Sequence, residues 1–240
     1  MSEKREIYLN GKNKPGAVFW AVLMERSIQG EAVAALLDVA GAAAQAGARR
    51  ISLGYMRTDM ARNLIVEAFL KHSNSPNDVL VMLDADHTHP PETVVQLAGY
   101  PAEIGVIGAL AYRRGGHFDP CWFVKGDDGE LHAAMTWEEG QVYECAAVGT
   151  GAIAIKRWVF DELDKAGYPW PYFRYEYPEA GAVPSEDIIF ARACMAAGVS
   201  HYCDTGLTTP HILTDYADGR QWREFVNSNK ETNLAINQEA

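Results

Sequence analysis

Residues 78–86 read DVLVMLDAD, and this stretch decides the fold class. Its centre, residues 79–83, is apolar without a break, which predicts a strand that helices cover on both faces. Pro90 and Pro91 follow closely and favour the start of a helix, because proline is well tolerated in a first helical turn. A fully covered strand followed by a helix is typical of a mainly parallel sheet.

The rest of the chain repeats this alternation of short apolar runs and helical patterns, which predicts an α/β fold in a single domain. Residues 111–145 are less regular and favour hairpins and loops. Asp59 and Ser185 are the expected N-caps of two helices. The expected strands are 17–24, 50–55, 78–83, 104–110, 146–155 (interrupted by two glycines) and 201–204. The expected helices are 31–46, 59–71, 156–166, 185–197 and 221–236.

The composition is that of a soluble globular protein, with 48% hydrophobic and 22% charged residues. The formal net charge of -11 argues against a general nucleic-acid binder, because phosphate binding needs a basic surface. A phosphorylated ligand would have to be held against this charge by a cation and a few placed arginines.

The sequence contains no apolar run near the length of about 18 residues that spans a bilayer, so we expect no transmembrane segment. The four cysteines lack CxxC spacing and are expected to be reduced, which favours the cytoplasm. The expected organisation is a polar N-terminal segment (1–16), one domain (17–215) and a helical tail (216–240). The oligomeric state is left open.

Asp84 and Asp86 follow the apolar strand directly. Ligands of open α/β sheets gather beyond the carboxyl ends of the strands, so two carboxylates at this point are well placed for binding. Hard divalent cations such as Mg²⁺ and Mn²⁺ prefer oxygen ligands and keep open positions for substrate phosphates. A solvated turn is the competing interpretation of the bare tripeptide.

Four segments together resemble a known family. The run VLVMLDADHTHPPETVVQLAG (79–99) resembles the DxD segment of GT-A glycosyltransferases, in particular the family-2-like enzymes and their small phage and bacterial relatives. VGTGAIAIKRWVFDEL (148–163) is similar to their glycine-containing strand and following helix, and PSEDIIFARACMAAGV (184–199) to their "ED" helix. CDTGLTTPHI (203–212) resembles their late strand and histidine. The resemblance covers roughly residues 17–213.

The resemblance implies a metal-dependent transfer of a sugar from a nucleoside diphosphate sugar, with a UDP-sugar favoured, to a hydroxyl acceptor. It implies a GT-A-like domain with Mn²⁺ or Mg²⁺ held by Asp86 and His211, and with Asp84 contributing to the metal or to the ribose of the donor. His87 is the second choice for completing the metal site.

In the ED segment, the resemblance implies that Asp187 removes the acceptor proton in an inverting reaction, while Glu186 positions the acceptor. Ordinary complementarity between acidic residues and the start of a helix is the alternative interpretation.

On the donor side, the resemblance places Arg57 and Arg62 near the phosphates, and Glu25 and Arg26 near the base and ribose. The turn after the first strand departs from the usual family pattern, so the base stays open. The aromatic loop 170–177 and residues 112–114 are candidates for an acceptor pocket.

Two other functions remain open. A sugar nucleotidyltransferase uses a related sheet and acidic metal ligands, but usually carries a glycine-rich loop after the first strand, where this chain has the single glycine of MERSIQGEA. A non-catalytic module that binds nucleotides or glycans would keep the fold without turnover.

Overall fold

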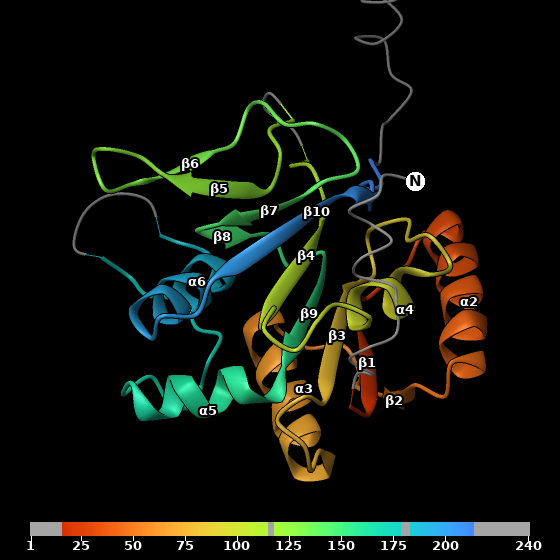
Figure 1. The fold of residues 1–240 in the computed structure, drawn as a ribbon. Helices are drawn as coiled ribbons and strands as arrows, with labels where there is room; N and C mark the ends of the chain where they lie inside the picture. Colours follow the sequence, from red (N-terminus) through yellow and green to blue (C-terminus); the bar gives the residue numbers. More distant parts are fainter. Residues whose placement is uncertain (1–15, 115–117, 179–182, 214–240) are drawn as a thin grey trace, which may run out of the picture.

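The computed structural model describes residues 16–114, 118–178 and 183–213, and the strand predicted from residues 78–83 lies inside its main sheet. This strand, β3, runs Val79–Asp84. The sheet has seven strands in the order β2-β1-β3-β9-β4-β10-β7 (Figure 1). The other six strands are β1 (Val18–Leu23), β2 (Arg49–Ile51), β4 (Val106–Leu110), β7 (Val142–Cys145), β9 (Ala152–Lys156) and β10 (His201–Thr208).

The sheet is mainly parallel. Strand β1 pairs in parallel with both β2 and β3, and β4 pairs in parallel with β10. Strand β9 is antiparallel to both β3 and β4, and β7 is antiparallel to β10. Because β9 opposes both of its neighbours, β3 and β4 point the same way, and their carboxyl ends meet at one edge of the sheet.

Helices cover both faces of this sheet. Figure 1 places α2 and α4 on one side and α3, α5 and α6 on the other. The two hydrophobic clusters divide in the same way, and alternate residues of β3 enter each of them: Val79, Val81 and Leu83 pack with α2 and α4, and Leu80 and Met82 with the other three helices. The predicted α/β fold with helices on both faces is therefore confirmed. The helices are α2 (Gly30–Gln45), α3 (Thr58–His72), α4 (Thr93–Ala98), α5 (Arg157–Lys165) and α6 (Glu186–Ala196).

A second, three-stranded sheet has the order β6-β5-β8. Its strands are β5 (Trp122–Lys125), β6 (Leu131–Ala133) and β8 (Ala147–Val148), and both of its pairings are antiparallel. It comes from the region for which hairpins were predicted. Helix α6 packs against β8, so this small sheet and α6 form a wall beside the main sheet.

The segment 146–155 is two strands rather than one. Strand β8 belongs to the small sheet and β9 to the main sheet, and the glycine-containing turn 149–151 separates them. A Cβ atom at Gly149 would lie 2.8 Å from the Cβ of Cys121, and one at Gly151 would lie 2.6 Å from Nε2 of His87. The glycines therefore allow a close approach of the chain to two side chains at the edge of the sheet.

Several helices and strands begin or end at residues other than those predicted. Strand β2 stops at Ile51, and β10 continues to Thr208. Helix α3 begins at Thr58 with Arg57 in the N-cap position, so Asp59 lies in the first turn and is not the cap. Ser185 does occupy the N-cap position of α6, but its side chain makes no capping hydrogen bond.

Some sequence predictions concern residues outside the described ranges. The segment 1–15 and the expected terminal helix 221–236 are among them. Within the ranges that the structure describes, none of the helices combines the length and apolar character that crossing a membrane requires.

Candidate active site

A cavity of about 1000 Å³ opens at the carboxyl ends of β1, β3 and β4. Its walls come from the ends of these strands, the turn 149–151, the start of α6 and the small sheet. Every site residue expected from the sequence lines this one cavity, although the segments lie up to 186 positions apart in the chain. These residues are Glu25, Arg26, Arg57, Arg62, Asp84, Asp86, His87, Glu186, Asp187 and His211.

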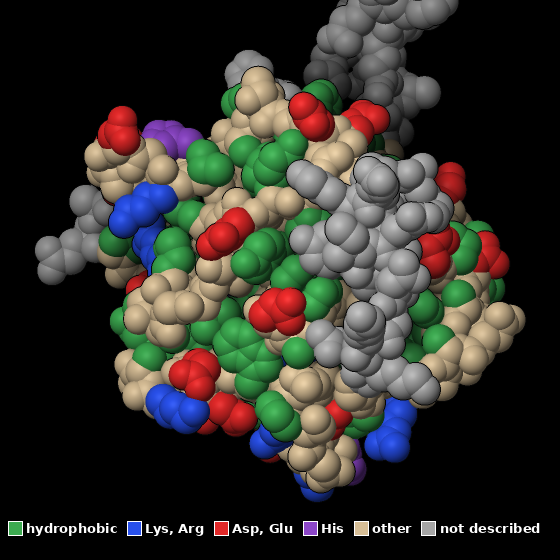
Figure 2. Space-filling view, in the orientation of Figure 1, with side chains coloured by type: hydrophobic (Ala, Val, Ile, Leu, Met, Phe, Trp, Pro, Cys, Tyr) green, Lys and Arg blue, Asp and Glu red, His purple; other side chains and the backbone are tan. Residues whose placement is uncertain are grey.

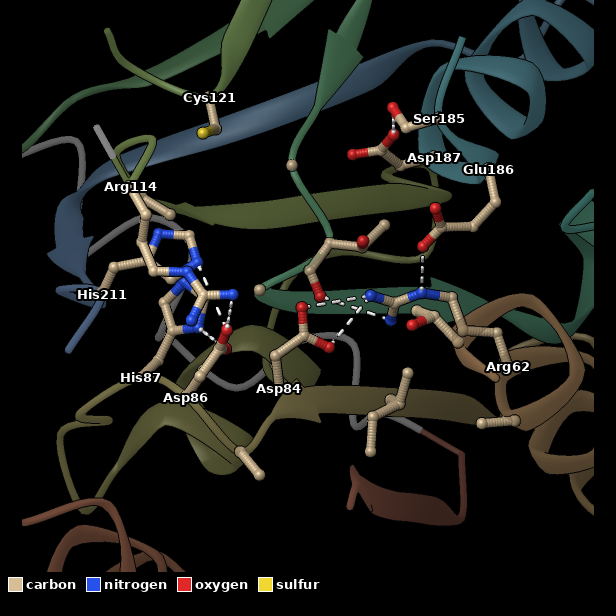
Figure 3. Close-up of a pocket in the computed structure, with 18 of the residues that line it drawn as sticks. Arg62, Asp84, Asp86, His87, Arg114, Cys121, Ser185, Glu186, Asp187 and His211 are labelled. Carbon is tan, nitrogen blue, oxygen red and sulfur yellow. Dashed lines mark hydrogen bonds and ion pairs between the residues drawn. The ribbon is translucent and has the colours of Figure 1, made fainter. Parts of the chain in front are cut away.

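One side of the cavity is organised around Asp86 (Figure 3). One of its oxygens lies 2.9 Å from Nδ1 of His87, and the other lies 2.8 Å from Nη2 of Arg114 and 3.9 Å from Nε2 of His211. Burial acts to raise the pKa of Asp86, but the hydrogen bond from His87 and the neighbouring positive charges outweigh it and lower this pKa to about 2. Asp86 is therefore an ionised carboxylate at any physiological pH.

Backbone hydrogen bonds bring His211 to Asp86. Residues His87 and His211 form an antiparallel bridge, the Ile212 N–H donates to the Asp86 carbonyl, and the Thr88 N–H donates to the Pro210 carbonyl. The two imidazole rings lie with their centroids 3.6 Å apart. The late histidine thus reaches the strand end through a short ladder of main-chain contacts.

Asp86, His87 and His211 offer ligand atoms within 4.8 Å of one another, which is a spacing that a single cation can bridge. Nδ1 of His211 contacts the carbonyl oxygen of Tyr112, so this nitrogen must carry the proton and donate it. Burial lowers the pKa of His211 and so favours the neutral ring, in which Nε2 has a free lone pair 3.9 Å from an Asp86 oxygen. Metal-binding histidines are commonly oriented through their second nitrogen in this way, so the donor set fits a divalent cation.

Asp84 has different surroundings, because both of its oxygens face Arg62. Nη2 of Arg62 lies 2.9 and 3.1 Å from these oxygens, and Nε of the same guanidinium lies 3.1 Å from Glu186. Burial raises the pKa of Asp84, although the charge of Arg62 acts against it. Asp84 is consequently outside the three-residue cluster around Asp86.

Arg62 was expected near the donor phosphates, but the structure buries its side chain. Its side chain is only 1% exposed, and its guanidinium lies above the ring of Phe173 and 3.5 Å from the Thr150 carbonyl oxygen. The donors of Arg62 are used within the protein, so it joins α3, the end of β3 and the start of α6 at the wall of the cavity.

Glu186 and Asp187 occupy the first turn of α6. Glu186 is buried against Arg62 and also hydrogen-bonds with Tyr175. Asp187 accepts hydrogen bonds from the Ser185 hydroxyl and, at 2.8 Å, from the Ile188 N–H. Burial and the charge of Glu186 raise the pKa of Asp187. A partly accessible carboxylate with a raised pKa has the properties of a general base.

The remaining expected residues line the cavity in looser arrangements. Arg57 forms an ion pair with Asp59 at 2.5 Å and is 64% exposed. Arg26 lies over the ring of Tyr55, with its guanidinium carbon 5.1 Å from the ring centroid. Glu25 is exposed beside Arg26.

Sequence analysis missed two residues of the site as individual candidates. Arg114 follows strand β4 at the same edge as Asp86, and an arginine just beyond a strand that ends at the binding edge was the available signal. Tyr175 belongs to the aromatic loop that was expected near an acceptor, but nothing in that loop identified which ring would reach Glu186.

No protein-family model matches this sequence, and none of the curated proteins does either. Among solved structures, the chain is similar to A197 from STIV, with 17% identity, 82% of this chain and 86% of that chain covered, and a TM-score of 0.49. It is also similar to a mutant Drosophila β-1,4-galactosyltransferase 7 in complex with manganese, UDP-Gal and xylobiose. That likeness has 13% identity, covers 86% of this chain and 79% of the other, and has a TM-score of 0.43. Both scores are below 0.5, so neither likeness assigns a function to this chain.

Proposed function

We propose that this chain is a metal-dependent glycosyltransferase that transfers a sugar from a nucleoside diphosphate sugar, with UDP as the favoured nucleotide, to a hydroxyl acceptor with inversion. The observation that carries the proposal is the meeting in one cavity of Asp86, His211 and Asp187. These residues come from three of the segments that resemble GT-A glycosyltransferases, and they lie far apart in the sequence.

The cluster of Asp86, His87 and His211 would hold Mn²⁺ or Mg²⁺. When bound, the cation supplies positive charge that offsets the charge of the departing diphosphate. Asp84 contributes negative charge beside this cluster while its ion pair with Arg62 keeps it fixed. The metal binding is proposed from the donor set and from the free lone pair of His211 Nε2.

The donor and acceptor take different walls of the cavity in this proposal. Glu25 and Arg26 follow β1 and Tyr55 follows β2, and at this place in the cavity they would contact the base and ribose. Arg57 would approach the phosphates from its exposed position, with one side of its guanidinium paired to the buried Asp59. Arg62 would not contact the donor, and its role would be to hold Asp84 in place.

Asp187 would take the acceptor proton. The acceptor oxygen forms a new bond to the anomeric carbon, the bond from that carbon to the diphosphate oxygen breaks, and the electron pair leaves with the diphosphate. The proton of the attacking hydroxyl passes to the Asp187 carboxylate. The raised pKa of Asp187 makes it a better proton acceptor than an ordinary aspartate. Glu186, held by Arg62 and Tyr175, would position the acceptor and fix the start of α6.

The test is manganese-dependent turnover of UDP-sugars, measured as release of UDP with water or a panel of hydroxyl compounds as acceptors. Asp86→Ala should abolish the release, and Asp187→Asn should lower it by about a hundredfold or more, within the range of general-base catalysis. Asp38→Asn is the matched control, because Asp38 is exposed on α2 and does not line the cavity. Full activity of Asp86→Ala would overturn the proposal.

A further inference from the structure

The cavity differs in charge from the rest of the chain. The whole protein has a formal net charge of -11, and Figure 2 shows acidic side chains scattered across one face of it. The cavity, in contrast, is lined by equal numbers of arginines and acidic residues, six of each. The arginines are Arg26, Arg57, Arg62, Arg113, Arg114 and Arg192.

Four of these arginines already have partners. Arg26 lies over Tyr55, and the other three form ion pairs: Arg57 with Asp59, Arg62 with Asp84 and Glu186, and Arg114 with Asp86. The guanidinium groups of Arg113 and Arg192 make no ion pair or hydrogen bond with any residue in the described ranges 16–114, 118–178 and 183–213. They are the positive charges of the cavity to which the described part of the chain gives no partner.

Arg192 belongs to α6, and Arg113 lies in the connection from β4 to β5, which leads into the small sheet. Arg192 follows Ser185 and Ile188 at helical spacing, and all three line the cavity from one face of α6. The backbone of Arg113 pairs with Asp119, two residues before Cys121. The carbonyl of Cys121 accepts a hydrogen bond from the turn that follows β8, and β8 packs against α6, so the backbone of Arg113 lies near the wall that carries Asp187.

We infer that the acceptor carries an anionic group, a phosphate or a carboxylate, which Arg113 and Arg192 bind while the acceptor hydroxyl faces Asp187. The inference rests on the proposed function, because Asp187 identifies this side of the cavity as the acceptor side. Guanidinium groups present paired donors that match phosphate and carboxylate oxygens. A neutral sugar acceptor would gain little from two unpaired positive charges, whereas an anion approaching this acidic protein needs them to offset the repulsion.

Glu130 offers a second test of whether charge in the cavity controls the binding of an anionic acceptor. It lines the same wall from the turn between β5 and β6 and is exposed. Its carboxylate would repel an anionic acceptor, so its removal should act in the opposite direction to the removal of either arginine.

The experiment measures binding by calorimetry to the full chain saturated with UDP and Mn²⁺. The probes are glycerol 1-phosphate, glycerate and the uncharged comparator glycerol. Glycerol 1-phosphate or glycerate should bind at least about tenfold more tightly than glycerol, and the preferred one of the two identifies the anion. Arg113→Gln and Arg192→Gln should each weaken that binding by about tenfold, and Glu130→Gln should strengthen it.

Arg49→Gln is the matched control, since Arg49 is an exposed arginine on β2 that does not line the cavity. It removes the same charge and should leave binding of the anionic probe unchanged. Equal binding of all three probes, or unchanged affinity in both arginine variants, would overturn the inference.

UDP binding in the presence of Mn²⁺ separates this inference from the proposed function. If UDP binds normally but the anionic probes do not, the acceptor assignment fails alone. If Arg113→Gln or Arg192→Gln weakens UDP binding and leaves the probes unaffected, these arginines serve the donor and the inference is wrong. If UDP does not bind to the wild-type chain with Mn²⁺, the proposed function itself fails.

Discussion

Asp84 and Asp86 are separated by one residue at the end of β3, yet they differ in their neighbouring side chains and in the direction of their pKa shifts. Asp84 faces a fully buried guanidinium that it shares with Glu186. Asp86 faces two imidazoles and the half-exposed Arg114. Burial raises the pKa of Asp84, whereas the neighbours of Asp86 overcome burial and lower its pKa to about 2. The spacing of a DxD motif brings two carboxylates together, but their neighbours decide which one supports the fold and which one is available to a cation.

The largest expected effect comes from removing the partner of Asp84. Arg62→Met leaves the carboxylates of Asp84 and Glu186 close together in a buried region without a positive charge. Breaking a buried ion pair in this way costs roughly 3–5 kcal/mol of unfolding free energy, which urea unfolding would measure.

Arg174→Gln is the control for this variant. Arg174 pairs with Glu176 on the surface, where an ion pair contributes little to stability, so its unfolding midpoint should scarcely move. A loss in Arg62→Met no greater than in Arg174→Gln would show that the buried network is not what holds α3, β3 and α6 together.

The second prediction compares the two aspartates directly through Mn²⁺ affinity. Asp86→Asn should weaken Mn²⁺ binding by more than about a hundredfold. Loss of a residue that only supports a metal ligand lowers metal affinity by about 10–100-fold, and Asp86 is a proposed ligand itself. Asp84→Asn should change the affinity far less, since Asp84 lies outside the three-residue cluster. Calorimetric titration of both variants measures the difference, and equal losses would place Asp84 among the ligands.

The third prediction concerns the pH dependence of stability. The folded-state pKa of Asp86 is about 2, below the value of about 3.9 for an exposed aspartate, so the unfolded chain binds more protons between these values. Asp86 therefore contributes stability above pH 4, and this contribution is lost as the pH falls toward 2. The difference in unfolding free energy between wild type and Asp86→Asn should close by about 1–2 kcal/mol over this range, after allowance for solvent screening. Urea unfolding at several pH values would measure it, and a difference that widens at low pH would contradict the assigned direction.

The smallest expected effect concerns the imidazoles. Two histidines and one carboxylate favour Mn²⁺ or another transition metal over Mg²⁺, because imidazole is a poor ligand for Mg²⁺. His87→Gln and His211→Gln should each weaken Mn²⁺ binding by about tenfold and reduce the preference over Mg²⁺. Calorimetry with each metal measures the preference, and His72→Gln, a change outside the cavity, is the control. An unchanged Mn²⁺/Mg²⁺ ratio in both variants would remove the histidines from the metal site.

Much of the fold follows from local sequence pattern. The apolar run 79–83 predicted the covered strand, and the regular spacing of apolar residues in 31–46 predicted helix α2 almost to its ends. The two strands hidden in 146–155 could not be separated in this way, because both parts are apolar. Their division depends on the close approach of Gly149 and Gly151 to side chains from distant segments.

The part of the candidate site that could be predicted consists of residues whose position at the end of a strand already indicates binding. Strand-end carboxylates and a late histidine were expected near each other, and they line one cavity. The burial of Arg62 was not predictable, since arginine is usually exposed, and its partner Glu186 is 124 positions away in the sequence. Long-range ion pairs leave no periodic signal in a sequence.

The central claim is that Asp86 and its imidazoles hold a cation that a nucleoside diphosphate shares. The most direct measurement is the affinity for UDP by calorimetry, with and without Mn²⁺, in the wild-type chain and in Asp86→Asn. Coupled binding predicts that Mn²⁺ strengthens UDP binding by about tenfold or more in the wild type and has little effect in the variant. An affinity for UDP that is the same with and without Mn²⁺ in the wild-type chain would contradict the account.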